Sequence, residues 1–285
     1  MKPDVIRRKA PDFGFDHEGI PTYWFAGDAF KTRFFDAMST MFPEGEKYFI
    51  ESVRAYREQI TDPALLNAVA DFTYQEAQHS LAHRQYNDRL KTQGIDVDRY
   101  ERAIKAYIGF VGRYLPKSVN LANTAAAEHL TAIMSHLWMQ ADVHRDSDVR
   151  MRALYHWHSI EEIEHKSVAF DVLKQVARVG YLTRVTSMAY ESVAFPISVF
   201  LYVDDMLKVD GFSRRERATL WRNGLRWLFG REGLLRMLLP SYLAYYRPDF
   251  HPWQAGSLAE YRSWREHYEQ HESAIEAARA GSAAA

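Results

Sequence analysis

The sequence predicts an all-α protein built on a four-helix bundle, with additional N-terminal and C-terminal helices. Valine and isoleucine recur at steps of three and four rather than two, so no segment is typical of a β-strand. A Glu-x-x-His motif occurs twice, at Glu76–His79 and at Glu162–His165. Each copy places a carboxylate and an imidazole one turn apart on the same helix face. Together these features are typical of a bundle that holds two metal ions.

Composition narrows the class of protein further. The chain has 285 residues, 47% of them apolar and 26% charged, with a formal net charge of −1, so we expect a single globular domain that does not bind nucleic acid. It has no cysteine, which excludes thiolate metal sites. We find no signal peptide, and the apolar stretch 192–203 is too short to span a membrane, for which roughly 18 residues are needed. These features predict a cytoplasmic protein.

The first half of the chain is expected to contain the bundle. Residues 1–27, with several prolines and glycines, predict an extended arm on the surface. Asp28 and Asp62 suit N-cap positions, and Pro43 is expected to separate two helices. The helices expected in this half are 28–41, 44–60, 63–93, 98–114, 117–144 and 149–179.

The composition changes after Gly180, where aromatic and basic residues alternate. A helix is expected at 182–208, and capping boxes at 213–216 and 257–260 each predict the start of another. We expect residues 43–180 to form the bundle core and 181–280 to form a helical cap, without a firm boundary between them.

In a helical hairpin, residues at equal distances along the chain from the turn lie at the same level. This distance, here called the depth, selects the ligands of the first hairpin. Glu76 and His79 lie 76 − 62 = 14 and 79 − 62 = 17 residues after Asp62. Glu46 lies 62 − 46 = 16 residues before it, but Glu51 only 11. A five-residue offset moves a side chain by about 7 Å along the axis, whereas two bridged metals lie roughly 3.5–4 Å apart. Glu46 is therefore the expected ligand, and Glu51 is not.

The second hairpin repeats this unit around a turn near Asp146. Glu128 lies 18 residues before the turn, and Glu162 and His165 lie 16 and 19 after it. His158, four residues before Glu162, shares its helix face and is a further candidate ligand.

A single Glu and His three residues apart is usually an exposed pair, but the repeat at matched depth favours a metal centre. His83 and Glu161 are expected beside the ligands as hydrogen-bond partners, although His83 and His158 could each be ligand or neighbour. Carboxylates and imidazoles without thiolate suit two metal ions, with iron favoured and manganese or zinc as alternatives. The expected ligands are Glu46, Glu76, His79, Glu128, His158, Glu162 and His165.

These motifs resemble a bacterial family described as predicted metal-dependent hydrolases, which implies a ferritin-like fold with a di-metal site. The resemblance covers about residues 20–255 and includes the segments 42–46, 75–80, 161–165 and 250–253. The order of the ligands is also similar to that of p-aminobenzoate N-oxygenase-type di-iron enzymes, whose extra histidine corresponds to His158. Acyl desaturase-like di-iron proteins share the bundle but lack that histidine.

Three functions are compatible with such a site. The first is a non-haem di-iron or di-manganese oxygenase or oxidase that uses O₂ and an external electron donor on a small apolar or amphipathic substrate. The second is a binuclear metal-dependent hydrolase. The third is metal storage, which does not explain residues 181–280. A homodimer and peripheral contact with a membrane surface are further partners that the sequence leaves open.

Overall fold

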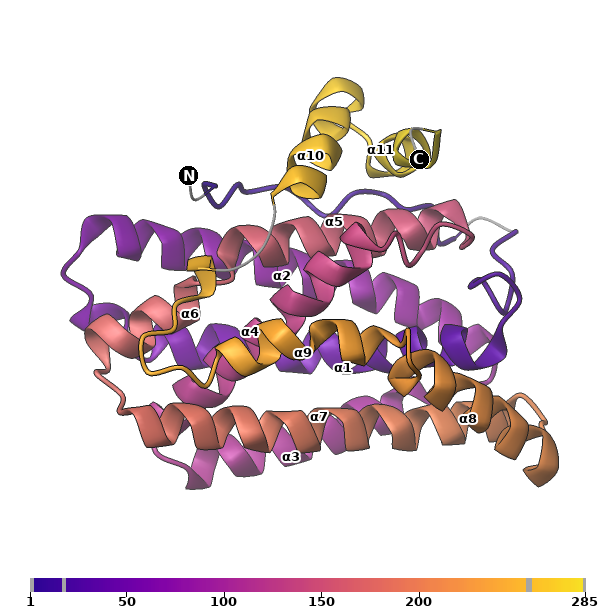
Figure 1. Cartoon of the computed structure of the whole chain (residues 1–285), viewed down its shortest axis with the longest axis horizontal. Coiled ribbons are helices and arrows are strands. Elements are labelled where there is room, and N and C mark those ends of the chain that lie inside the picture. Colours follow the sequence, from indigo (N-terminus) through magenta and orange to yellow (C-terminus); the bar gives the residue numbers. More distant parts are fainter. Residues whose placement is uncertain (1–2, 17–18, 255–257, 284–285) are drawn as a thin grey trace.

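The computed structural model describes residues 3–16, 19–254 and 258–283, and within them it is an all-α bundle, as the sequence predicts (Figure 1). No strand occurs in these ranges; Phe25 and Ser147 form one isolated β-bridge. The helices are α1 (Ala29–Arg54), α2 (Pro63–Thr92), α3 (Val97–Tyr114), α4 (Lys117–Gln140), α5 (Val149–His165), α6 (Val168–Asp171), α7 (Tyr181–Val209), α8 (Arg214–Phe229), α9 (Leu234–Ala244), α10 (Ala259–His271) and α11 (Ala274–Ala283).

The four central helices are two hairpins, α1 with α2 and α4 with α5. Asp62 caps α2 by accepting from the Ala64 amide, with Pro63 in the first turn, and Asp148 caps α5 in the same way. Outside them, α7 packs on α1 and α4, α3 on α1, and α9 on α4, while α10 and α11 cover α5 (Figure 1).

The helix break expected at Pro43 is wrong, because α1 continues through it. A proline inside a helix leaves the carbonyl four residues earlier without its amide donor. Here that carbonyl belongs to Ser39, and the side-chain amide of Asn87 on α2 donates to it at 3.0 Å. Packing between the two helices thus offsets the missing hydrogen bond, and the separate helix 28–41 does not exist.

The expected helix 149–179 is also interrupted. It ends at His165 and is followed by α6 and by a π-helical turn at Val172–Val176. Ser167 departs from ideal helical geometry, and its backbone carbonyl accepts from the Asp171 amide at 2.7 Å. Such irregular turns are frequent next to functional residues.

The N-terminal arm runs along the outside of the bundle as expected, but several of its side chains are buried, which was not expected. The arm is extended, but Phe13, Trp24 and Phe25 belong to the main core. The Trp24 indole donates to Asp36 at 3.0 Å and to the Tyr86 hydroxyl at 2.8 Å. Buried aromatic side chains therefore anchor the arm in the core, even though its sequence has the composition of a loop.

In the second half, the capping box of α8 is confirmed: Ser213 and Glu216 exchange hydrogen bonds of 2.8 and 3.4 Å. The capping box expected at Ser257 lies outside the described residues. None of the helices in the described ranges has the length and hydropathy needed to cross a membrane.

Candidate metal centre

Seven side chains meet in the middle of the bundle, each of them buried. Every central helix contributes: α1 supplies one of them, α2 two, α4 one and α5 three, because the matched depths along the two hairpins bring the four helix faces to one level. They are Glu46, Glu76, His79, Glu128, His158, Glu162 and His165, the set that the sequence selects.

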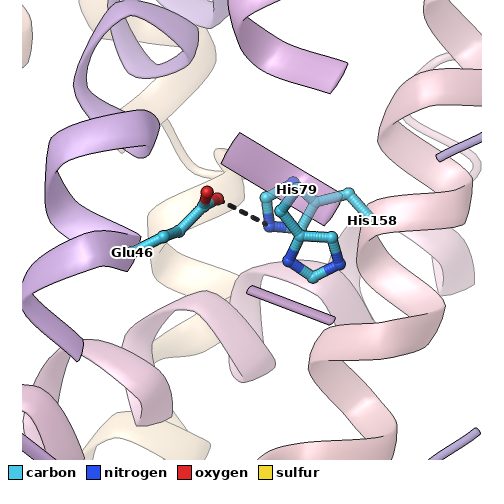
Figure 2. Close-up of side chains that lie close together, drawn as sticks. All are labelled: Glu46, His79 and His158. Atoms are coloured by element: carbon cyan, nitrogen blue, oxygen red, sulfur yellow. Dashed lines mark ion pairs between the residues drawn. The ribbon is translucent and has the colours of Figure 1, made fainter. Parts of the chain in front are cut away.

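Their ligand atoms form overlapping groups in which every atom lies within 4.8 Å of the others. Glu46, His79 and His158 form one group, which Figure 2 shows converging from three helices. Glu76 with Glu128 and His165 forms a second. A third group, Glu76 with His79 and Glu162, links the first two. Because Glu76 belongs to two of these groups and His79 to two, the three groups form one continuous cluster.

Glu162 occupies the centre of this cluster. Its Oε1 lies 3.1 Å from His158 Nε2, 3.6 Å from His165 Nε2 and 3.8 Å from His79 Nδ1. Burial alone would raise the pKa of this carboxyl, but the surrounding imidazoles hold it well below its usual range. Its other oxygen accepts a short hydrogen bond from the Thr131 hydroxyl.

The other three carboxyl groups are destabilised as anions. Burial raises the pKa of Glu46, Glu76 and Glu128, and repulsion from neighbouring carboxylates adds to the rise. His165 Nε2 lies 3.0 Å from Glu76 and 3.4 Å from Glu128. Burial would lower the pKa of His165, but these carboxylates raise it well above its usual value. The cluster therefore concentrates negative charge that a cation would balance.

Several ligand atoms of the cluster have no hydrogen-bond partner within the described residues. These buried atoms are both carboxylate oxygens of Glu76 and of Glu128, Oε1 of Glu46, Nδ1 of His79 and Nε2 of His165. Buried polar atoms without partners are costly and rare in proteins. Because they are oxygen and imidazole nitrogen atoms that converge on one space, the residues present fit divalent metal ions.

His83 lies behind His158 rather than inside the cluster. Its Nε2 is 2.8 Å from His158 Nδ1, and its Nδ1 is 2.8 Å from the Ser39 hydroxyl. That hydroxyl donates to Asn87 Oδ1, so it accepts from His83 Nδ1. His83 Nε2 must then accept from His158 Nδ1, which leaves the lone pair of His158 Nε2 directed at the carboxylates. The chain of hydrogen bonds thus selects the tautomer that a metal ligand needs.

Glu161 and Gln75 orient the other two imidazoles. Glu161 Oε2 lies 3.1 Å from His79 Nε2, and Gln75 Oε1 lies 2.9 Å from His165 Nδ1. Each oxygen accepts from one ring nitrogen, so the other nitrogen of the ring faces the cluster. Glu161 is placed as expected, whereas Gln75 was not expected, although it directly precedes Glu76.

Sequence reasoning also missed the ion pair between Arg8 and Glu164, which supports Glu161 and Gln75. Arg8 forms two hydrogen bonds to Glu164, of 2.8 and 2.9 Å, and one of 3.4 Å to Glu161. The Tyr261 hydroxyl of α10 also donates to Glu164, at 2.9 Å. Nothing in the sequence indicates that a residue of the arm, 156 positions earlier, meets this part of α5.

Glu51, which the sequence excludes, and His129, the neighbour of Glu128, both lie outside the cluster. The side chain of Glu51 is 65% exposed and lies 4.0 Å from Lys47. His129, next to Glu128, donates to the Ser241 carbonyl at 3.1 Å, on the side of α4 that faces α9.

The family model described as predicted metal-dependent hydrolase matches residues 7–256. The chain belongs to this family. The resemblance seen in the motifs is therefore confirmed over most of the sequence. The family description agrees with metal dependence and, of the reactions expected, with hydrolysis better than with oxidation. Neither the curated proteins nor the solved structures gave a match to this chain.

Proposed function

We propose that this chain is a metal-dependent enzyme with a dinuclear centre. The observation that carries the proposal is the buried set of four carboxylates and three imidazoles whose ligand atoms lack other partners. Four carboxylates balance the charge of two divalent cations, and the donor set suits iron first, with manganese or zinc as alternatives. Glu46, Glu76, His79, Glu128, His158, Glu162 and His165 would hold the two ions, with Glu76 and Glu162 central to the cluster.

The substrate is proposed to be apolar or amphipathic, because an apolar cavity of about 100 Å³ reaches the cluster. Phe42, Phe49 and Ile108 are among its walls, and Glu46 and Thr131 are polar groups where it meets the centre. Such walls exclude water and position a carbon chain, while Glu46 is the carboxylate that could hold a proton beside it.

The reaction that this geometry supports best is the O₂-dependent oxidation of such a substrate, with electrons from an external donor. Two redox-active metal ions, when bound, would provide the redox chemistry that O₂ activation needs, with the electrons coming from the external donor. The protein would exclude water and hold the imidazoles in the required tautomers through His83, Glu161 and Gln75. Seven donor side chains also leave few open positions, whereas hydrolysis needs room for a water nucleophile and for the bond to be cleaved.

Hydrolysis is the second candidate, and the family description favours it. A metal ion would then lower the pKa of a water molecule, and Glu46 would accept its proton beside the apolar cavity. The expected storage role remains a weaker proposal, because it gives the apolar cavity no purpose.

One experiment separates the two reactions. Metal content is measured first, and the reduced iron-loaded protein is then mixed with O₂ while its visible spectrum is followed. The zinc-loaded protein is tested in parallel on acyl esters. Oxidation predicts a new absorption band with iron and no ester cleavage; ester cleavage with zinc and no reaction with O₂ would establish hydrolysis instead. Fewer than one metal per chain would overturn the dinuclear centre.

A further inference from the structure

The apolar cavity at the cluster adjoins a larger one. We call the first, with Phe42, Glu46 and Thr131 in its wall, the inner cavity. The outer cavity, of about 370 Å³, lies between α7 and α9. Three side chains line both cavities and form the wall between them: Leu130, Met134 and Phe195. All three are apolar, and methionine side chains adapt easily to a passing ligand.

The mouth of the outer cavity lies at the surface. Phe229 and Leu239 line it and are 56% and 48% exposed. Arg231 and Arg236 are exposed and lie close to these residues in sequence, Arg236 one helical turn before Leu239. Neither arginine is paired with a carboxylate in the part of the chain that the structure describes. Exposed apolar side chains thus line the mouth, and two arginines adjoin it in sequence, together with the exposed carboxylate of Glu232.

We propose that a single-chain amphiphile with an anionic head group binds tail-first through the outer cavity. Its tail passes the wall at Met134 into the inner cavity, and its head stays at the mouth near Arg231 and Arg236. The centre would then face a carbon of the tail that is distant from the head group. Only the reaction of the bound amphiphile at the centre rests on the proposed function. Its binding in the two cavities does not need the metals.

A direct route past Tyr107, which is 43% exposed and lines the inner cavity, is the competing entrance. The outer route is favoured because its cavity, of about 370 Å³ against about 100 Å³, is the larger of the two and opens between exposed apolar side chains. Substituting residues on each route therefore tests the proposal.

Binding of carboxylates from hexanoate to tetradecanoate is measured by calorimetry on the protein as purified. We expect affinity to rise about fourfold per added methylene until the tail fills both cavities. Met134→Trp should end that rise at a shorter chain, while Leu201→Trp, at an exposed site that lines neither cavity, should not. An unchanged series in Met134→Trp, with loss of binding in Tyr107→Trp, would establish the competing route and overturn ours.

Surface variants keep the test valid if Met134→Trp fails to fold. Leu239→Gln at the mouth should weaken every chain length by a similar factor, whereas Leu243→Gln, one turn further along α9 and 54% exposed, should have no effect. Arg236→Gln should weaken carboxylates by about two- to fivefold and leave the corresponding alcohols unchanged. Equal effects at Leu239 and Leu243, or binding only to anionic lipid vesicles, would contradict the proposal.

The orientation is tested with manganese-loaded protein and ¹³C-labelled tetradecanoate. The paramagnetic ion should broaden the methyl signal more than the carboxyl signal; the reverse would overturn tail-first binding. If the protein binds no metal but the chain-length series holds, the proposed function fails while the proposed binding mode stands.

Discussion

The two hairpins share one unit, a Glu followed by a Glu-x-x-His motif, but are covered differently. α2 leaves a long face in solvent, whereas every residue of α5 from Met151 to His165 is buried. α5 lies between the bundle on one side and the arm, α10 and α11 on the other (Figure 1). The two copies of the sequence motif therefore lie on helices that differ in their exposure to solvent.

Two neighbouring arginines of the arm show what the difference requires. Arg7 pairs with Asp71 of α2 at the surface, where the arginine side chain is 53% exposed. Arg8 pairs with Glu164 and Glu161 of α5, where its side chain is 8% exposed and both carboxylates are fully buried. Water can solvate charged side chains on the exposed face of α2. On α5 the carboxylates are buried, so the protein must supply a cationic partner for them.

The largest expected effect tests what the hairpins share. Replacing Glu76 of α2 or His165 of α5 by Ala should each reduce metal content from about two ions per chain to less than one, because each removes a donor from the compact cluster. Elemental analysis of the purified protein measures this. Glu46→Ala should lose at least one ion and Glu51→Ala neither; full loading of Glu76→Ala or His165→Ala would contradict the assignment.

The next effect tests how the hairpins differ. Arg8→Ala leaves two buried carboxylates without their cation and should lower the free energy of unfolding by about 3–5 kcal/mol. Arg7→Ala removes an exposed pair and should cost less than about 1 kcal/mol. Denaturant unfolding of both variants measures the difference, and equal losses would show that the pairing on α5 does not stabilise the fold.

The second hairpin should also give the protein a pH dependence through His136 of α4. Burial lowers the pKa of His136 to about 4, and the Lys166 charge adds to the effect. The unfolded chain, with an ordinary pKa near 6.5, binds the proton more readily between these values. Stability should therefore fall as the pH drops from 6.5 to 4, by about 2–3 kcal/mol from this group.

Unfolding measured at several pH values in His136→Gln should show a shallower loss than the natural chain. His271→Gln, at an exposed position on α10, provides the control. Parallel curves for His136→Gln and the natural chain would refute the role of this group.

The smallest expected effect is on metal affinity, through the hydrogen bond that joins His83 of the first hairpin to His158 of the second. His83→Phe removes the acceptor that fixes the tautomer of His158, and we expect metal affinity to fall about 10- to 100-fold while two ions can still bind. Competition with a chelator measures the affinity. Complete loss of one ion would indicate that His83 is itself a ligand.

The sequence by itself predicted most of the helices and the stripe of candidate ligands that the bundle brings together. Asp62 with Pro63 and Ser213 with Glu216 are local capping signals, and the spacing of Glu76 and His79 places them on one face of any helix. Because both hairpins have short turns, depth from the turn sufficed to select Glu46 over Glu51. These inferences use contacts between residues that are near in sequence or related by one turn.

Only the tertiary structure decided the features that depend on distant residues. Asn87 lets α1 continue through Pro43 by donating to Ser39 from a helix 48 positions away. Arg8 reaches Glu164 across 156 positions and fastens an arm with the composition of a loop to α5. Neither residue carries a periodic or capping signal, because its effect arises from the free energy of burying a polar group far along the chain, which a local pattern does not encode.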